Sequence, residues 1–257
     1  MNTGEKLIAL KAIVTKEILR FSRIWIQTVL PPVITTALYF IIFGNLIGPR
    51  IGEMDGFGYM EFIIPGLIMM AVITNSYANV VSSFYGSKFQ RHIEEMLISP
   101  VPNYIILIGY VSGGVARGLT VGVAVTVVSL VFHPLNIHSL WVMFSMIILT
   151  AILFSLAGLI NGVYAKSFDD ISIIPTFVLT PLTYLGGIFY SISMLPEFWQ
   201  QLSLANPILY MVNAFRYGFL GVSDISLLTS YAISIGFIIA LYVFSLYLLR
   251  KGHGIRT

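Results

Sequence analysis

The sequence predicts an all-α membrane protein, and its composition is the first reason. The chain has 257 residues, of which 57% are hydrophobic and 10% are charged, and its mean hydropathy is +0.90. Water-soluble domains carry about 25% charged residues, so lipid must surround much of this chain. The second reason is a series of continuous apolar runs of about 20 residues, the length at which a helix crosses the hydrocarbon layer. Backbone groups in lipid must be satisfied within one segment, which favours helices over the short alternating strands of a β-barrel.

Six apolar runs have the length of membrane-spanning helices. They cover residues 24–47, 60–82, 104–131, 140–162, 173–191 and 228–249. We treat residues 1–257 as a single transmembrane domain, because no linker or low-complexity segment divides them. Residues 1–23 are too charged, and the run that follows is too long, for the ~7–15-residue apolar region of a signal peptide, so we expect no cleavage.

Lysine and arginine residues set the expected orientation. If the N-terminus lies inside, 11 of the 14 Lys and Arg residues are cytoplasmic. They are Lys6, Lys11, Lys16, Arg20, Arg23, Lys88, Arg91, Lys166, Arg250, Lys251 and Arg256. Arg50 and Arg216 fall on the other side, and Arg117 lies within a span. The positive-inside rule therefore places both termini in the cytoplasm, and an even number of spans agrees.

Residues 5–23 have the pattern of an amphipathic helix that lies along the membrane surface. Apolar residues recur in steps of three and four on one face, at Leu7, Leu10, Val14, Ile18 and Phe21. Basic residues gather on the opposite face, at Lys16, Arg20 and Arg23. Such a helix binds the interface through its apolar face. Two interpretations remain open: a simple lipid anchor, or a helix that also contacts a cytoplasmic partner.

Several kinds of chemistry are not expected. The chain has no cysteine, so a thiolate nucleophile and a cysteine-bound metal are excluded. It lacks the G-x-x-x-x-G-K-[ST] pattern of a P-loop. Its four histidines have no metal-site spacing, and the net charge of +3 does not suggest nucleic-acid binding. We therefore predict a protein that is not an enzyme, with no catalytic residue, no metal and no cofactor of its own.

One segment points to a family. It begins with Leu179-Thr180-Pro181-Leu182-Thr183-Tyr184-Leu185-Gly186-Gly187-Ile188, passes through Leu195-Pro196, and ends with Pro207-Ile208-Leu209-Tyr210 and Arg216. Together with Phe62-Ile63-Ile64-Pro65-Gly66-Leu67 and Ile93-Glu94-Glu95-Met96-Leu97-Ile98-Ser99-Pro100, it resembles the sequence patterns of ABC-2 type transporter permeases. The resemblance covers essentially the whole chain. One departure is that Arg91 and His92 stand where many members have Gly-Thr.

The resemblance implies the permease subunit of an ATP-driven exporter in the bacterial inner membrane. It implies the fold of type V exporters, a homodimer, and two copies of a separate ABC subunit that bind ATP and Mg²⁺. Family substrates include drugs, lipids, lipo-oligosaccharides and polysaccharides. The alternative is a secondary transporter or channel that works without an ATPase. Ion coupling would call for intramembrane carboxylates, and the predicted spans have almost none.

The predicted cytoplasmic loop 83–102 is the candidate for ATPase coupling. Its apolar residues, Phe89, Ile93, Met96 and Leu97, are spaced to share one helical face. Charged and polar residues lie beside them, at Arg91, His92, Glu94 and Glu95. The resemblance implies that this short helix enters a groove on the ATPase; the alternative is a helix packed on its own bundle. The loop Val163–Ile171 is a weaker candidate and reads as a solvated turn.

Arg117 is the only charge expected deep in a span. A charge there costs about 2.5–3.5 kcal/mol on insertion scales, so it should face protein or a wet cavity. Gly114, Gly118 and Gly122 recur every four residues, a spacing that lets another helix approach closely. One interpretation is a structural arginine bonded to backbone carbonyls at a helix break. The other is a residue of the transport path that favours an anionic headgroup.

The region after the fifth span is the second candidate for a path or gate. Pro181 and Gly186-Gly187 interrupt a predicted membrane helix. Residues 192–221 should form a periplasmic segment rich in aromatics, including Trp199 and Tyr210, and Arg216 lies within it. The resemblance implies short re-entrant helices in the outer leaflet. They either gate the exit or simply anchor the domain as an aromatic belt.

Overall fold

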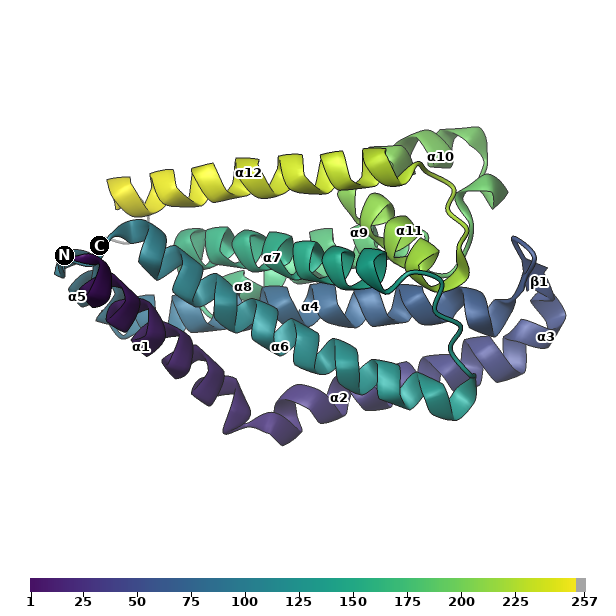
Figure 1. Ribbon diagram of the computed structural model, residues 1–257, viewed down its shortest axis with the longest axis horizontal. Helices are drawn as coiled ribbons and strands as arrows, with labels where there is room; N and C mark the ends of the chain where they lie inside the picture. The colour runs from purple at the N-terminus through teal and green to yellow at the C-terminus, as the bar shows by residue number, and fades with distance from the viewer. Residues whose placement is uncertain (253–257) are drawn as a thin grey trace.

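The computed structural model describes residues 1–252, and most of them are helical (Figure 1). Arg256, one of the basic residues assigned to the cytoplasm, lies outside the described residues. The helix α1 (Thr3–Ser22) begins and the helix α12 (Leu227–Lys251) ends at the same end of an elongated bundle. We call this end the terminal end.

Five helical segments are long and apolar enough to cross a membrane. The first, Trp25–Ile51, joins α2 (Trp25–Tyr39), the π-helical segment η1 (Phe40–Ile47) and α3 (Gly48–Ile51). The others are α4 (Tyr59–Phe89), α6 (Asn103–Phe132), α7 (Leu140–Tyr164) and α12. They match the first four predicted spans and the last one.

The fifth predicted span, residues 173–191, differs from the expectation of one continuous helix. Helical structure runs through α8 (Asp170–Ile174), the π segment η2 (Pro175–Leu179) and α9 (Thr180–Tyr184), and then stops. A turn follows in which Gly187 has φ +72°, a left-handed conformation that glycine adopts without strain. This helical stretch is shorter than the about 20 residues of a typical crossing, so six crossings remain a prediction.

The helix α4 is the centre of the bundle. It packs against α6, α7 and α11 (Pro207–Leu220), and most of its side chains are buried. Small residues on its neighbours make this packing close: a Cβ atom added to Gly118 would lie 3.2 Å from Cβ of Ser76, and one added to Gly158 would lie 2.5 Å from the Tyr77 carbonyl oxygen. The predicted close approach along the α6 glycines is therefore confirmed; the partner helix is α4, joined by α7 at Gly114 and Gly122.

The elements opposite the terminal end are short (Figure 1). Between α3 and α4, the strands β1 (Glu53–Met54) and β2 (Phe57–Gly58) form an antiparallel hairpin. After α9 come the 3₁₀ turn η3 (Ile192–Met194) and α10 (Glu197–Leu204). The helix α11 then packs among α4, α7 and α12, so the predicted outer segment 192–221 consists of one peripheral helix and one core helix.

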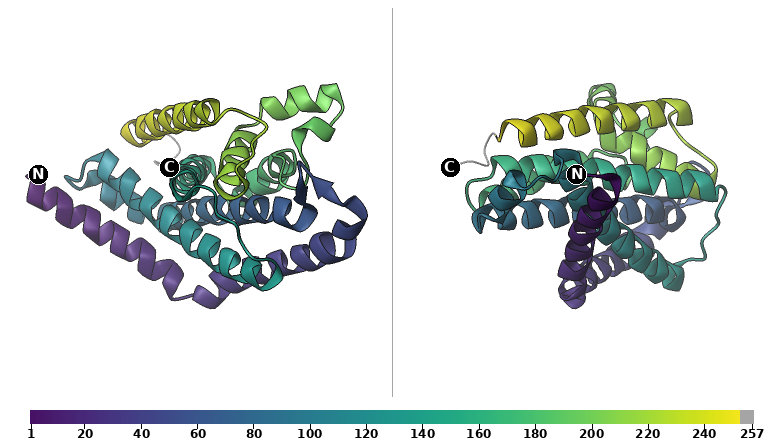
Figure 2. Two further views of the ribbon diagram at one scale, coloured as in Figure 1. Left: turned by 45° about the vertical axis from the view of Figure 1, so that its right-hand side comes forward. Right: turned by 60° about the vertical axis from the view of Figure 1, so that its left-hand side comes forward.

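The predicted amphipathic helix exists as α1, but it lies against α6 (Figure 2), and only part of its predicted apolar stripe is buried there. The buried side chains are Ile13, Glu17 and Phe21, whereas Leu7 and Ile18 of the predicted stripe are exposed. Glycines of α6 explain why this face of α1 is buried, because Ile13 and Glu17 lie directly over Gly109 and Gly113. The exposed apolar residues remain available to lipid.

Candidate functional site

The predicted coupling loop is more helical than expected. Its first residues belong to the last turns of α4, which ends at Phe89. Arg91 then adopts a left-handed conformation with φ 61°, and the short helix α5 (His92–Ile98) follows. The prediction that Phe89 shares one helical face with Ile93 is therefore wrong, because this break redirects the chain.

The apolar side of α5 packs on its own bundle. Ile93 is fully buried in a cluster with Phe84 and Ile106, and Met96 and Leu97 pack against the same cluster. The alternative of packing on the bundle is thus confirmed for these side chains. What remains exposed is a different set, which we call the coupling surface: Phe89, Arg91, His92, Glu95 and Ile98. Glu94 is half-buried beside it.

The second loop, predicted as a solvated turn, exposes Lys166, Phe168 and Asp169 and is also bonded to α4. Lys88 donates hydrogen bonds of 2.7 Å to the carbonyl oxygens of Val163 and Ala165, at the end of α7. The ring of Phe168 contacts those of Tyr85 and Phe89, with centroids 4.9 and 5.2 Å apart. These contacts join the two loops into one unit at the terminal end.

A capping carboxylate orders the second loop further. Asp170 accepts hydrogen bonds from the backbone N–H groups of Lys166 and Ser167, at 2.8 and 3.1 Å. Because these donors favour the ionised form, they hold the pKa of Asp170 below its ordinary value of 3.8.

A buried acidic residue, which the sequence interpretation missed, joins α1 to the bundle. Glu17 is fully buried; it accepts a 2.8 Å hydrogen bond from the Ser83 hydroxyl and forms ion pairs with Lys16 and Arg20 at 3.2 and 3.4 Å. Arg20 also donates to the backbone and side-chain oxygens of Asn79 at 2.8 and 2.7 Å. The basic residues assigned to the cytoplasmic face thus hold α1 against α4. The Gly109–Gly113 spacing was the available sequence signal for a docked helix.

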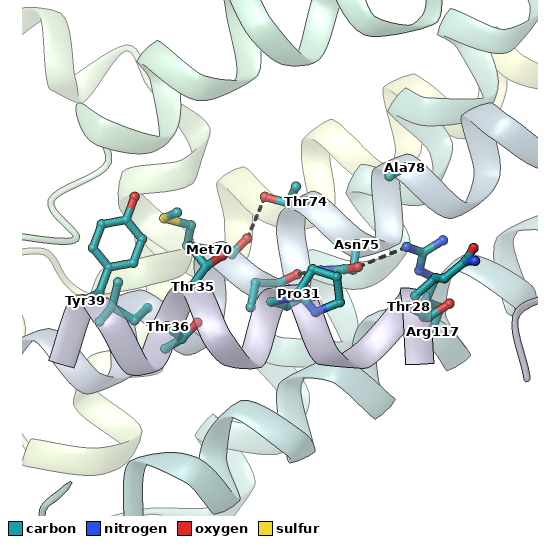
Figure 3. A pocket seen from close by; sticks show the side chains of 14 residues that line it. Thr28, Pro31, Thr35, Thr36, Tyr39, Met70, Thr74, Asn75, Ala78 and Arg117 are labelled. Carbon is teal, nitrogen blue, oxygen red and sulfur yellow. Dashed lines mark hydrogen bonds between the residues drawn. The ribbon is translucent and has the colours of Figure 1, made fainter. Parts of the chain in front are cut away.

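A cavity of about 350 Å³ with both polar and apolar lining residues lies between α2, α4 and α6 (Figure 3). The α2 side presents a stripe of polar and proline residues at one-turn spacing, which are Gln27, Thr28, Pro31, Pro32, Thr35, Thr36 and Tyr39. The α4 side presents Met70, Thr74 and Asn75, and Arg117 of α6 closes one end. The spacing of the α2 residues can be read from the sequence, but the sequence does not say which helix faces them.

Arg117 lines this cavity with few partners. One of its terminal nitrogens donates to the Asn75 side-chain oxygen at 3.3 Å, and the Asn75 amide donates in turn to the Ala71 carbonyl at 3.0 Å. Within residues 1–252, its Nε is buried without a hydrogen-bond partner, and it forms no ion pair. The interpretation that placed Arg117 on backbone carbonyls at a helix break is therefore wrong.

Arg216 sits in a closed site at the other end of α4. Its guanidinium lies 3.8 Å from the centre of the Phe62 ring and donates to the Gly187 carbonyl. The side chain is fully buried, although the sequence placed it outside the membrane core.

The remaining predicted path residues divide into buried and exposed groups. Gly186 packs against Ile208, and the Tyr210 hydroxyl donates to the Leu204 carbonyl at 2.7 Å. Pro181 and Trp199 are exposed, and Trp199 fits an aromatic belt better than the buried rings of α11 do. Arg117, the other predicted path residue, lines the separate cavity described above. No cluster of three His, Asp or Glu side chains able to hold a metal occurs in the described part of the chain.

Comparisons with known proteins agree with the motif analysis. The ABC-2 type transporter family matches residues 8–220. The inner membrane transport permease YadH of Escherichia coli (strain K12) is 63% identical over 97% of this chain and 98% of its own length. Nodulation protein J of Rhizobium leguminosarum bv. viciae is 23% identical over 72% of this chain and 71% of its own. The chain is therefore a multi-pass inner-membrane protein that belongs to the ABC-2 type transporter family.

Proposed function

We propose that the chain is the permease subunit of an ATP-driven exporter whose ATPase is a separate polypeptide. The family match and the similarity to a transport permease support a transport role. The absence of a P-loop from all 257 residues supports a separate source of ATP energy. Two copies of the chain with two ATPase subunits form the expected complex, and ATP with Mg²⁺ binds only to the ATPase.

The observation that carries this proposal is the coupling surface. It combines an aromatic side chain, Phe89, with the charges of Arg91 and Glu95 at one end of the central helix. Buried Ile93 and the Lys88 contacts fix this surface to α4 and α7. A force applied to a rigidly attached surface moves the helices behind it, whereas a loose loop would absorb the motion.

The proposed topology places the coupling surface and both termini in the cytoplasm. The segment α8–α9 forms the sixth crossing or part of one, and α10 lies in the outer leaflet. The chain has no cysteine, so single cysteines introduced at Gln90 and Gln201 report on the two sides without background. Both positions are exposed. A membrane-impermeant maleimide added to intact cells should label Gln201→Cys only; labelling of Gln90→Cys would overturn the orientation.

The ATPase partnership is tested first by whether the neighbouring reading frame encodes a P-loop ATPase, and then by co-purification of that ATPase with this chain. Phe89→Ala and Glu95→Lys should each reduce the recovered ATPase at least about tenfold, because they remove apolar area and reverse a charge at the interface. Phe198→Ala and Glu197→Lys are matched controls, since both residues are exposed on α10. Full recovery with the first pair would exclude the coupling surface as the docking site.

Transport without an ATPase is the alternative function. The purified chain reconstituted alone into liposomes should move no solute, and adding the ATPase with ATP should start transport. Solute movement by the chain alone would establish a channel or secondary transporter and refute the proposal.

A further inference from the structure

We propose that the cavity between α2, α4 and α6 binds the anionic, hydroxyl-bearing headgroup of an amphiphile through Arg117. That this amphiphile is the transported cargo rests on the function proposed above. The binding site itself is argued from the geometry of the cavity alone.

The first step is the uncompensated charge. Arg117 is the fifteenth of the 30 residues of α6, which places it midway along a membrane-spanning helix. Two other buried charges have neighbours that stabilise them: Glu17 has two basic partners, and the Arg216 guanidinium lies against the Phe62 ring. Arg117 has only the Asn75 oxygen, and its Nε faces no acceptor in residues 1–252. A cation held in this way inside a membrane is suited to an anion that arrives from outside the chain.

The second step is the orientation of the guanidinium. Asn75 is buried, and its amide N–H is committed to the Ala71 carbonyl, so its oxygen is fixed toward Arg117. This bond leaves the other terminal nitrogen of the guanidinium without a hydrogen bond in residues 1–252, at the end of the cavity where Figure 3 shows Arg117. A guanidinium matches the two oxygens of a phosphate or carboxylate, and such paired hydrogen bonds are roughly twice as strong as neutral ones.

The third step is the chemistry of the remaining wall. Pro31 and Pro32 have no N–H, so the carbonyl oxygens of Gln27 and Thr28, four residues earlier, receive no helical hydrogen bond from them. Both residues line the cavity. Free carbonyl oxygens accept hydrogen bonds from hydroxyls, which gives the headgroup its second property.

The fourth step is size and the apolar side. A volume of about 350 Å³ falls in the range of small-molecule sites, roughly 300–1,000 Å³. Leu67, Met70 and Ala71 line the same cavity. They provide an apolar wall for the first methylene groups of a tail, which a free anion would not use.

The test is equilibrium binding of a tail-labelled phosphatidylglycerol to the purified full chain in dodecyl maltoside micelles. This lipid carries both a phosphate and hydroxyls, whereas the detergent is neutral. Unlabelled phosphatidylglycerol should displace the probe at least about tenfold better than diacylglycerol or phosphatidylcholine. Glycerol 3-phosphate, which has the headgroup without a tail, should compete at least about tenfold more weakly than the lipid; equal competition would mean a free-anion site and overturn the amphiphile.

Variants assign the binding to the cavity. Arg117→Gln should weaken binding about tenfold or more, because it removes the charge. Arg117→Lys and Asn75→Ala should each weaken it about threefold, through loss of the fork and of its orientation. Arg23→Gln removes the same charge from an exposed position and should change nothing. Wild-type binding by Arg117→Gln, or an equal loss in Arg23→Gln, would overturn the site.

Two readouts keep the two proposals separate. Probe binding needs no ATPase, and co-purification of the ATPase needs no lipid probe. If Arg117→Gln fails to fold, Arg117→Lys and Asn75→Ala decide the question in its place. Loss of the site with normal ATPase docking would refute only this inference, whereas a functional site with no ATPase partner would refute only the export function.

Discussion

Two arginines contact the central helix α4 in opposite ways. Arg216 lies in a closed site, stacked on the Phe62 ring and bonded to the Gly187 carbonyl. Arg117 lies at the edge of a cavity and has one hydrogen bond, to Asn75. The same residue type thus stabilises the fold at one position and, we infer, is kept for a ligand at the other. Burial and hydrogen bonding do not separate the two roles, because each arginine makes one hydrogen bond and leaves its Nε without a partner in the described residues. The difference is the Phe62 ring against the Arg216 guanidinium and the cavity of about 350 Å³ beside Arg117.

The strongest test of this comparison is Arg216→Ala. It leaves the Gly187 carbonyl without its donor and opens a void beside Phe62, so we expect a loss of about 3–5 kcal/mol of stability. Thermal unfolding in detergent, followed by size-exclusion chromatography, measures the change. Arg216→Lys keeps the charge and should recover part of the loss. A fully stable alanine variant would show that this site is not structural.

Glu17→Ala tests the other closed polar site. The substitution leaves Ser83 without its acceptor and removes the partner of Lys16 and Arg20, which costs about 1–3 kcal/mol. The same thermal assay applies, and Glu95→Ala, at an exposed carboxylate, is the control. If Glu17→Ala and Glu95→Ala have the same melting temperature, the Glu17 network does not hold α1 in place.

Arg117→Gln should change stability by less than about 1 kcal/mol, because a single 3.3 Å hydrogen bond is lost and the cost of a buried charge is removed. Its effect should instead appear in the reconstituted transporter, as lost stimulation of ATP hydrolysis by an anionic amphiphile. A fall in melting temperature as large as that of Arg216→Ala would erase the distinction between the two arginines.

The smallest effect concerns Asp170, whose carboxylate accepts hydrogen bonds from two backbone N–H groups. Its pKa is lowered in the folded state, so its contribution to stability is present above the ordinary value of 3.8 and disappears as the pH falls through the lower folded value. Wild type should melt slightly above Asp170→Asn at pH 7, and the gap should close at strongly acidic pH. Asp169→Asn, whose side chain makes no hydrogen bond in the described residues, should show no such gap.

Patterns along the chain predicted the long elements well. Five of the six predicted spans are continuous membrane-length helices, since apolar runs of that length have no other way to satisfy their backbone in lipid. The predicted glycine stripe on α6 also packs as expected. Within the loop 83–102, the predicted shared face of Phe89 and Ile93 was wrong, because the left-handed turn at Arg91 redirects the chain between them.

The candidate site was predicted only in part. Arg117 was singled out because a charge in a span is costly wherever it points. The sequence did not predict three other features: the partner Asn75, the cavity beside the polar stripe of α2, and the role of Glu17. Each depends on which faces of separate helices meet. Spacing within one helix is fixed at 3.6 residues per turn, but contact between helices has no such rule.

By itself, the sequence determined that this protein crosses a membrane several times, that it belongs to the transporter class its motifs resemble, and that it has no P-loop. These properties follow from local composition and short spacings. Only the tertiary structure decided that Arg216 is enclosed while Arg117 opens into a cavity. The environment of a charge is made by residues distant in the chain, and only packing brings them together.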